Sequence, residues 1–395
     1  MRPLAIVAST LVNACGTGWG EFAAALRHGR SGLVANDFPP AREVATFIGR
    51  VRGLEDAPLS PRFARFDCRV NRLVQLALEQ DGFTAAVAAA RARLGARRIG
   101  VFVGTSTSGI LDTELATRSA LRAGAAPHLD AAFRTCRHSM MAPVRFIREA
   151  LDLRGIAMTI STACSSSAKV FASAARAIDS GLCDAALVGG ADSLALSTLH
   201  GFRSLELLST EPCRPCDAAR NGISIGEAAG FALLVPGVES AVRFTGSGES
   251  ADAWHMSTPH PEGAGALRAM RAAIASAGID ARAVDYVNLH GTATIANDLS
   301  EDRAVCAALP HRPDVSSTKG WTGHALGAAG VTEALITAYA LEQQWVPATL
   351  GCRTVDPRLG MRVAIGSRNA RLVHALSNSF GFGGSNCSLL LSRTP

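Results

Sequence analysis

The chain has 395 residues, of which 48% are hydrophobic and 18% charged, so it can bury the core of one large or two medium domains. Its formal charge of +6 comes mostly from arginines scattered singly rather than in runs, which does not predict a nucleic-acid partner. No apolar run reaches the roughly 18 residues of a membrane-spanning helix, so no membrane association is expected. Ten irregularly spaced cysteines predict free thiols and a cytoplasmic location.

The first half of the chain alternates short apolar strands with longer alanine-rich helices. The N-terminal stretch MRPLAIVASTLVNAC is predicted to contain the first strand rather than a lipoprotein-like leader, because Ser9, Thr10 and Asn13 interrupt its apolar run. Further strands are predicted in RRIGVFVGTS, GIAMTIST and CDAALVGGAD, and helices in MAPVRFIREALDL and AKVFASAARAIDSG. Polar or glycine-rich composition predicts extended loops over Ser108–Pro127 and Ser209–Gly226.

The second half repeats this order of elements, in ALRAMRAAIASAGID, AVDYVNLHGT, SEDRAVCAAL, PDVSST, GAAGVTEALITAYALEQQ and HALSNSFGFGGSNCSLLL. The repeat predicts an α/β protein with an internal structural duplication, divided near Pro236–Arg243, where a strand ends in Pro-Gly. We therefore expect one half over residues 1–237 and another over 238–395. No linker separates them, so they are expected to pack closely as one body.

One cysteine stands at a position suited to chemistry. In TISTACSSSAKV, Cys164 follows a predicted strand and precedes a predicted helix. The positive end of a helix dipole lowers the pKa of a thiol and favours the nucleophilic thiolate. Free cysteines are also among the most buried residues, so this segment alone leaves a catalytic and a core role equally open. The C-x-x-C of Cys213 and Cys216 lacks a second ligand pair, and no metal site is expected.

Two histidines favour the catalytic interpretation. His290 closes a predicted strand in VDYVNLHGTAT, and His324 follows the strand PDVSST in a glycine-rich loop. Ligands of α/β sheets collect at the C-terminal ends of strands. Both histidines are therefore candidates for one site with Cys164.

Several longer motifs share an order and spacing that resembles one family. They are NACGTGWGEFAAALRHGRSGL, TACSSS, GGADS, DAWHMSTPHPEGAGALRAM, HGTATIAND, TKGWTGHALGAAGVTEA and SNSFGFGGSNCSLLL. Together they resemble the elongating β-ketoacyl-acyl-carrier-protein synthases of the Cys-His-His type, over nearly the whole chain. The resemblance implies a thiolase-like fold, with two similar α/β halves packed as a layered α-β-α-β-α body. It also implies condensation of malonyl-carrier protein with an acyl chain, with no cofactor beyond the carrier's phosphopantetheine.

The resemblance implies specific catalytic roles. Cys164 attacks the incoming thioester to form an acyl-enzyme, and neutral His290 and His324 stabilise the enolate formed when malonyl loses CO₂. The backbone N–H groups of Cys164 and Phe382 form the oxyanion hole, and the glycines around Phe382 suit an aromatic gate. Lys319 and its partner Glu333 contribute orientation and electrostatics.

Substrate-binding roles and partners follow from the same resemblance. Thr292 and Thr294 match hydroxyls that bind the pantetheine arm, Phe380 is placed beside them, and Thr107 matches a position that limits the acyl chain. An acidic acyl carrier protein is the expected partner, docking on arginines near the pocket mouth. A homodimer is expected, and a heterodimer with a second ketosynthase subunit stays open.

Two questions stay open at this point. TACSSS resembles polyketide synthases as much as fatty-acid synthases, so a specialised pathway such as that of an aryl polyene is an alternative to primary fatty-acid synthesis. A chain-length-factor-like partner subunit would share the fold without elongating chains. Such subunits usually lack the nucleophile, whereas this chain has Cys164 and both histidines.

Overall fold

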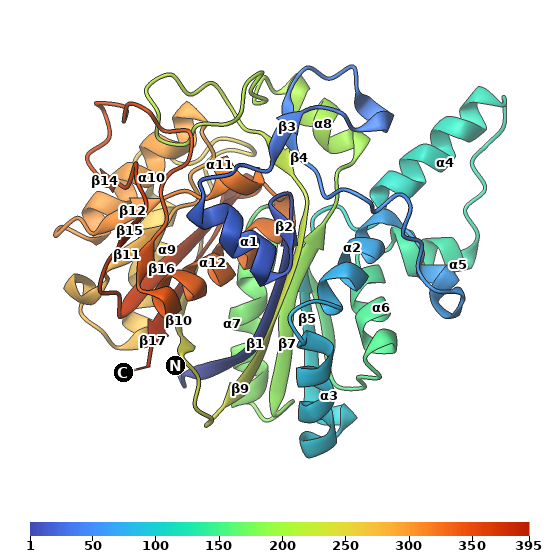
Figure 1. The fold of residues 1–395 in the computed structure, drawn as a ribbon, viewed down its shortest axis with the longest axis horizontal. Coiled ribbons are helices and arrows are strands. Elements are labelled where there is room, and N and C mark those ends of the chain that lie inside the picture. Colours follow the sequence, from blue (N-terminus) through green and yellow to red (C-terminus); the bar gives the residue numbers. More distant parts are fainter. Residues whose placement is uncertain (395) are drawn as a thin grey trace.

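The strands of the computed structural model, which describes residues 1–394, repeat one order twice (Figure 1). The first set runs β1 (Leu4–Asn13), β9 (Ala228–Pro236), β7 (Ala185–Asp192), β5 (Ile99–Gly104) and β6 (Ala157–Ile160). The second runs β10 (Val242–Ala251), β17 (Ser385–Arg393), β16 (His374–Gly381), β11 (Tyr286–Asn288) and β12 (Asp314–Ser316), with β14 (Arg362–Val363) at its edge. This confirms the predicted pair of similar α/β halves.

The two sets join where β1 pairs with β10 over only two residue pairs, Leu4 with Phe244 and Ala5 with Arg243. The division at 237/238 stays a prediction, and it falls in the turn between β9 and β10. Strand β2 (Gly16–Thr17) also belongs to the main sheet, where it pairs antiparallel with the end of β1. Outside that sheet lie a trio of β3 (Leu33–Ala35), β4 (Phe47–Gly49) and β8 (Ile225–Gly226), and a pair of β13 (Trp345–Val346) and β15 (Arg368–Asn369).

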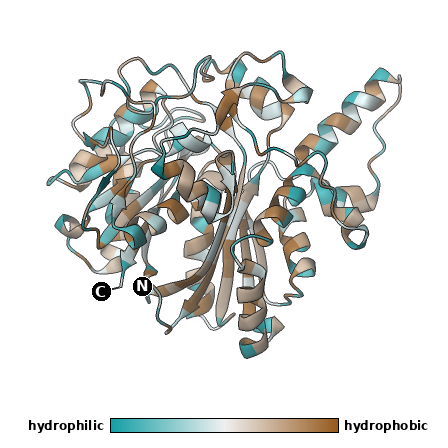
Figure 2. Ribbon diagram, viewed as in Figure 1, coloured by the Kyte–Doolittle hydropathy of each residue, from teal (hydrophilic) through white to brown (hydrophobic). Residues whose placement is uncertain are grey.

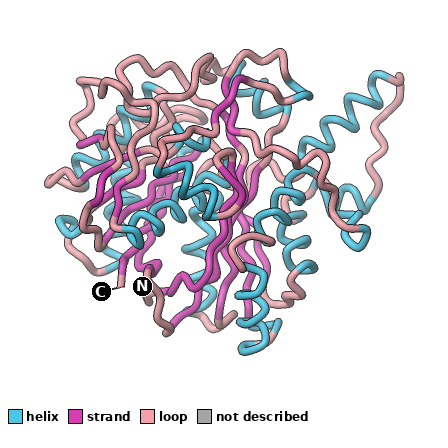
Figure 3. Tube along the Cα trace, viewed as in Figure 1, coloured by secondary structure: helices cyan, strands magenta, loops and turns pink. Residues whose placement is uncertain are grey.

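Helices form a central layer and two outer layers. The central layer consists of α7 (Ser166–Asp179), which packs on β5 and β7, and α12 (Ala329–Gln343), which packs on β16, β17 and α7. The outer layer of the first half is α2 (Arg69–Leu78), α3 (Phe83–Leu94) and α6 (Ala142–Ala150), and that of the second is α9 (Ala264–Ala277) and α10 (Ile295–Ala308). Loops gather at one edge of the body (Figure 3), around α8 (Leu196–Ser204) and α11 (Lys319–Thr322), whereas α1 (Trp19–Arg27) lies nearer the middle of the view (Figure 1).

The apolar residues of the strands face both layers, which is why the strand segments read as nearly continuous hydrophobic runs. In β7, Ala186 and Val188 join the central core, whereas Ala185 and Leu187 join the core under α2, α3 and α6. Side chains alternate across a strand, so one short segment contributes to two cores. Figure 2 shows this concentration of hydrophobic residues along the strands of the first half.

The two central helices approach each other unusually closely at Gly330. A Cβ at this position would lie 2.6 Å from the backbone nitrogen of Ala168 in α7. In addition, the Val331 N–H donates to Ser167 Oγ at 2.9 Å. Glycine is needed here because no side chain fits between the helices.

One predicted loop is wrong. Residues Ile110–Arg122 form helix α4, which projects from the body together with α5 (Ala131–Phe133) (Figure 1). Its sequence, ILDTELATRSALR, consists mainly of good helix formers, and its polarity reflects exposure rather than irregular structure. Only Leu111 of this helix is buried. Among the described residues, no helix combines the length and apolarity required to cross a membrane.

Candidate active site

Cys164 occupies the connection between β6 and α7, two residues before the helix begins. Ala163 precedes it with a φ of 52°, a left-handed conformation that is uncommon for a residue with a side chain. The backbone N–H of Phe382 donates to the Cys164 thiol, and the neighbouring Gly381 lies so close to Cys164 N that a Cβ there would be 3.3 Å away. The turn thus presents the thiol to the second half of the molecule.

The expected low thiol pKa is not found. Burial raises the pKa of Cys164 to about 12, although the nearby Lys319 and the Phe382 N–H act in the opposite direction. The side chain is only 6% exposed, so removal from water disfavours the thiolate more than the local positive groups favour it. Cys164 therefore rests as a thiol.

The structure brings Cys164 together with both predicted histidines. The sulfur and a ring nitrogen from each of His290 and His324 lie within 4.8 Å of one another. The two imidazoles are buried and nearly perpendicular, with ring centroids 5.4 Å apart. His290 follows β11 and His324 follows α11, so the second half supplies both imidazoles and the first half supplies the thiol.

Both imidazoles are held as neutral donors. Burial and the Lys319 charge keep the pKa of His290 and that of His324 well below the usual range. Nδ1 of His324 accepts from the Leu326 N–H at 3.1 Å, and Nδ1 of His290 lies 3.5 Å from Lys319 Nζ. In each neutral ring the proton therefore belongs on Nε2, from where it can be donated to a substrate oxygen.

Lys319 and Glu333 lie behind the histidines rather than in the cavity. Lys319 forms a buried ion pair with Glu333 and donates to the backbone carbonyl of His290 at 2.5 Å. Burial raises the pKa of Glu333 to about 7, against the effect of Lys319. This pair is placed to orient His290 and to keep both imidazoles deprotonated.

Glu301 is a residue that sequence reasoning missed. Its two carboxylate oxygens accept from the N–H groups of His290 and Gly291, each at 2.8 Å, and Asn378 donates to it at 3.1 Å. Burial raises the pKa of Glu301 to about 7. The sequence offered part of a signal, because Asp298, Glu301 and Asp302 share one face of α10 at spacings of three and four. Only the structure shows that this face is buried.

A cavity of about 390 Å³ opens onto the three central side chains. Its lining includes the predicted substrate-binding residues Thr292, Thr294 and Phe380, as well as Phe382. The Thr292 and Thr294 hydroxyls lie 2.9 Å apart, and Thr294 also caps α10.

Phe382 lies on a loop whose shape depends on glycine. Gly383 has a φ of 78°, with no atom within 4 Å of where a Cβ would lie, and Gly384 has a φ of 72°. The Phe382 ring stacks on Phe202 with centroids 5.4 Å apart. The loop is held on its far side because the Gly383 N–H donates to the Met256 carbonyl at 2.7 Å.

Thr107 is not among the residues that line this cavity. Its hydroxyl donates to Asp192 at 2.8 Å, and the same carboxylate accepts from Thr105, Ser106 and the Gly327 N–H. Asp192 thus ties the end of β5 to the segment that follows His324. Sequence reasoning noted the GGADS motif without a role for this aspartate.

One thiol and two imidazoles within 4.8 Å of one another could also coordinate a Zn²⁺ ion. The Nδ1 contacts described above direct protonated Nε2 atoms toward the centre. Metal binding would replace those protons, so the two uses of the site exclude each other.

Comparison with known proteins identifies the family. The family model described as "Beta-ketoacyl synthase, N-terminal domain" matches residues 1–239, and "Beta-ketoacyl synthase, C-terminal domain" matches residues 242–353. The 3-oxoacyl-[acyl-carrier-protein] synthase 2 of Vibrio cholerae is 33% identical over 401 residues, covering 93% of this chain and 94% of that relative. The match to the chloroplastic synthase II of Arabidopsis thaliana, 37% identical, spans 62% of this chain and about half (49%) of that relative.

Among solved structures, a chain from the complex of the ketosynthase ApeO with its chain length factor ApeC, from Xenorhabdus doucetiae, superposes with a TM-score of 0.91. That chain is 36% identical, and the superposition covers 100% of this chain and 98% of the other.

Proposed function

We propose that this chain, which belongs to the β-ketoacyl synthase family, condenses malonyl-carrier protein with an acyl chain held on Cys164. The enzyme is an acyltransferase, and its family takes acyl groups from the phosphopantetheine of acyl carrier protein without a further cofactor. The observation that carries the proposal is the convergence of Cys164 with two imidazoles whose pKa values lie well below the usual range.

In the first half-reaction, Cys164 Sγ attacks the carbonyl carbon of the acyl thioester. The developing oxyanion is placed against the backbone N–H groups of Cys164 and Phe382. The C–S bond to the pantetheine arm then breaks, and the departing sulfur takes up the proton that the thiol loses. Because burial raises the thiol pKa to about 12, this proton leaves only as the substrate binds.

In the second half-reaction, malonyl-carrier protein replaces the first carrier. The bond between the malonyl carboxylate and its methylene carbon breaks, CO₂ leaves, and the electron pair passes to the thioester as an enolate. The Nε2–H groups of His290 and His324 donate to that enolate oxygen. The enolate carbon attacks the acyl carbonyl, the C–S bond to Cys164 breaks, and the product is two carbons longer. The released Cys164 thiolate takes up a proton from water and returns to the resting thiol.

We propose that the chain works as a dimer, with itself or with a second ketosynthase subunit. Two features support an interface on the first half. Strand β6 ends the sheet order, with Met158 40% exposed, and helix α4 projects with Leu121 67% exposed. The similarity to a ketosynthase complex with a chain length factor supports the heterodimer and a specialised pathway such as that of a polyketide.

We place the chain in the cytoplasm, where its ten cysteines, all of them free, would stay reduced. We propose an acidic carrier protein as the partner, because the chain has a formal charge of +6. The carrier would dock on arginines near the cavity mouth.

Intact-protein mass spectrometry tests the function. Wild type and Cys164→Ala are incubated with a panel of acyl-carrier proteins, and malonyl-carrier protein is then added. We expect an adduct on wild type that disappears on malonyl addition, a product two carbons longer, and no adduct on the variant. Failure of every acyl group to load would contradict elongation and indicate a partner subunit instead.

A further inference from the structure

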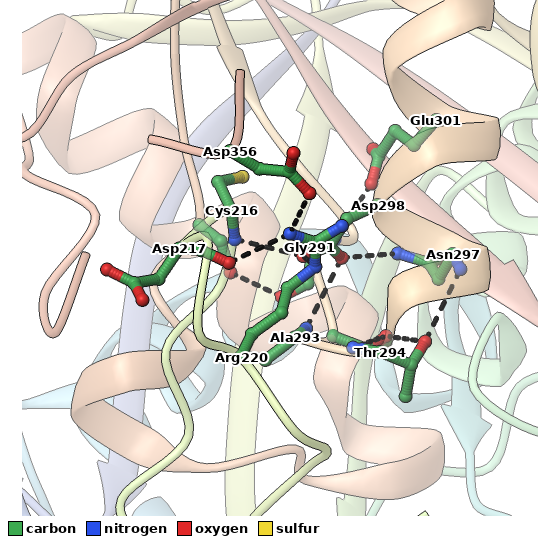
Figure 4. Close-up of polar contacts among 12 residues, drawn as sticks. Cys216, Asp217, Arg220, Gly291, Ala293, Thr294, Asn297, Asp298, Glu301 and Asp356 are labelled. Atoms are coloured by element: carbon green, nitrogen blue, oxygen red, sulfur yellow. Dashed lines mark hydrogen bonds and ion pairs between the residues drawn. The ribbon is translucent and has the colours of Figure 1, made fainter. Parts of the chain in front are cut away.

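Arg220 is a buried cation outside the catalytic group. Its side chain has no exposed surface, and it bridges two carboxylates (Figure 4). Its Nε lies 3.1 Å from Asp298 Oδ2, and its Nη1 donates to Asp356 Oδ2 at 2.6 Å. The same Nη1 donates to the Asp217 carbonyl at 2.8 Å. An arginine with this burial holds three chain segments in one arrangement.

Asp298 connects Arg220 to the turn that precedes α10. It accepts from the Ala293 N–H at 3.3 Å, from Asn297 Nδ2 at 3.2 Å and from the Cys216 N–H at 2.9 Å (Figure 4). Ala293 needs this support because its φ is 68°. Ala293 lies between Thr292 and Thr294, so the position of both hydroxyls depends on Asp298.

The charges of the cluster balance. Asp356 has a second, largely exposed partner in Arg358, so the two carboxylates face two guanidinium groups. Burial raises the pKa of Asp298, while Arg220 acts to lower it. Loss of Arg220 would leave Asp298 as a buried carboxylate without a cation.

The chain segments next to Arg220 and next to Asp298 both line the cavity. Asn221, Gly222 and Ile223 follow Arg220 directly and line the cavity. Thr292, Thr294, Ala296 and Asn297, which surround Asp298 in sequence, line it as well. The Arg220–Asp298 contact therefore fixes the separation of the two lining segments, 221–223 and 292–297.

We propose that Arg220 is a positioning residue that sets the spacing between these two segments and thereby the fit of the pantetheine arm on its way to Cys164. The inference rests on the proposed function only for the identity of the ligand. Arg220 does not touch the reacting atoms, so its loss impairs binding of the arm and leaves the nucleophile itself unchanged.

The test compares two alkylating reagents on Cys164. Bromoacetyl-pantetheine carries the arm, whereas iodoacetamide does not; in both cases a bond forms from Sγ to carbon and halide leaves. For Arg220→Met, we expect the half-saturating concentration of bromoacetyl-pantetheine to rise at least tenfold, while the iodoacetamide rate stays within twofold of wild type.

Two further variants separate positioning from general stability. Arg69→Met removes an arginine of similar burial from Glu227, away from the cavity lining, and should leave both reagents unaffected. Arg220→Met combined with Asp298→Asn removes both charges, which avoids an unpaired buried carboxylate. We expect this double variant to recover thermal stability yet keep the weak saturation by the pantetheine reagent, and it carries the test if the single variant does not fold.

Equal changes with both reagents, or no change in half-saturation, would overturn the role of Arg220. Neither reagent requires condensation activity. The alkylation result therefore stands even if wild type fails to elongate an acyl chain, and that failure would count against the proposed function alone.

Discussion

Lys319 holds His290 at two points: Nζ donates to its backbone carbonyl at 2.5 Å and lies 3.5 Å from its Nδ1. After burial, the charge of Lys319 is the next cause that lowers the pKa of His290, and it lowers that of His324 as well. The lysine therefore keeps both imidazoles neutral without entering the cavity.

Replacement of Lys319 by Met should raise the pKa of both histidines, because the lysine charge that lowers each pKa is removed. Protonated imidazole appears as pH falls, so the acidic limb of malonyl decarboxylation should move to higher pH. CO₂ release from malonyl-carrier protein between pH 5 and 9 measures this. The control is Lys169, the only other lysine, which pairs with Glu249. Lys169→Met should leave the acidic limb in place. An unmoved limb in Lys319→Met would contradict this electrostatic role.

Each histidine should matter for decarboxylation far more than for acylation. Loss of one donor to a developing oxyanion slows a reaction about 100- to 1,000-fold. His324→Ala and His290→Ala should show such a loss in CO₂ release and still form the acyl-Cys164 adduct by mass spectrometry. His324→Asn retains an N–H donor and should lose less than His324→Ala. Equal loss in both half-reactions would argue for a general disruption of the site.

The free enzyme should show no reactive thiolate at neutral pH. Since the pKa of Cys164 is raised to about 12, the thiolate fraction increases about tenfold for each pH unit below that value. The rate of iodoacetamide alkylation at Cys164, followed by peptide mass spectrometry, should rise steadily from pH 7 to 9. A plateau in this range would show a thiol activated before substrate binds.

Thr107 remains the predicted determinant of acyl length. Thr107→Ile adds bulk beside Asp192 and should shorten the longest product, as measured by mass spectrometry of carrier-bound chains. Thr107→Ser keeps the hydroxyl that donates to Asp192 at 2.8 Å and should preserve the wild-type distribution. An unchanged distribution in the Ile variant would remove Thr107 from the acyl pocket.

Metal should inhibit rather than support the reaction. The imidazoles direct Nε2–H donors toward the substrate, and a bound Zn²⁺ would replace those protons and occupy Cys164. We expect activity to persist after dialysis against a chelator and to fall when zinc is added. Loss of activity on chelation, restored by zinc, would reverse this assignment.

The sequence was sufficient to predict the elements that carry the central group. Cys164, His290 and His324 each follow a recognisable strand, and strand ends share one edge of a sheet, so their convergence was predictable. The pKa of Cys164 was not, because it depends on burial in the folded protein and on contacts with Gly381 and Phe382, which are more than 200 positions away in the chain.

The missed residues share a physical reason. Glu301, Asp192 and Arg220 are buried charges whose partners lie on other elements. In the sequence they resemble solvated surface residues, since a local pattern does not show which polar face is covered. The prediction for helix α4 was wrong for the opposite reason, because the polar residues of an exposed helix resembled those of a loop.

The contact of Gly330 with α7 has a mechanical consequence. Helix α7 begins just beyond Cys164, and α12 begins just beyond the His324 loop, so the spacing of the two helices bears on the positions of the nucleophile and of one imidazole donor. Gly330 has only a hydrogen where another residue has a side chain, and this hydrogen packs against the backbone of Ala168 in α7. A methyl group at this position would push α7 and α12 apart. The thiol and imidazole atoms that now lie within 4.8 Å of one another would then separate, although none of these residues is changed and the substitution is more than a helical turn away.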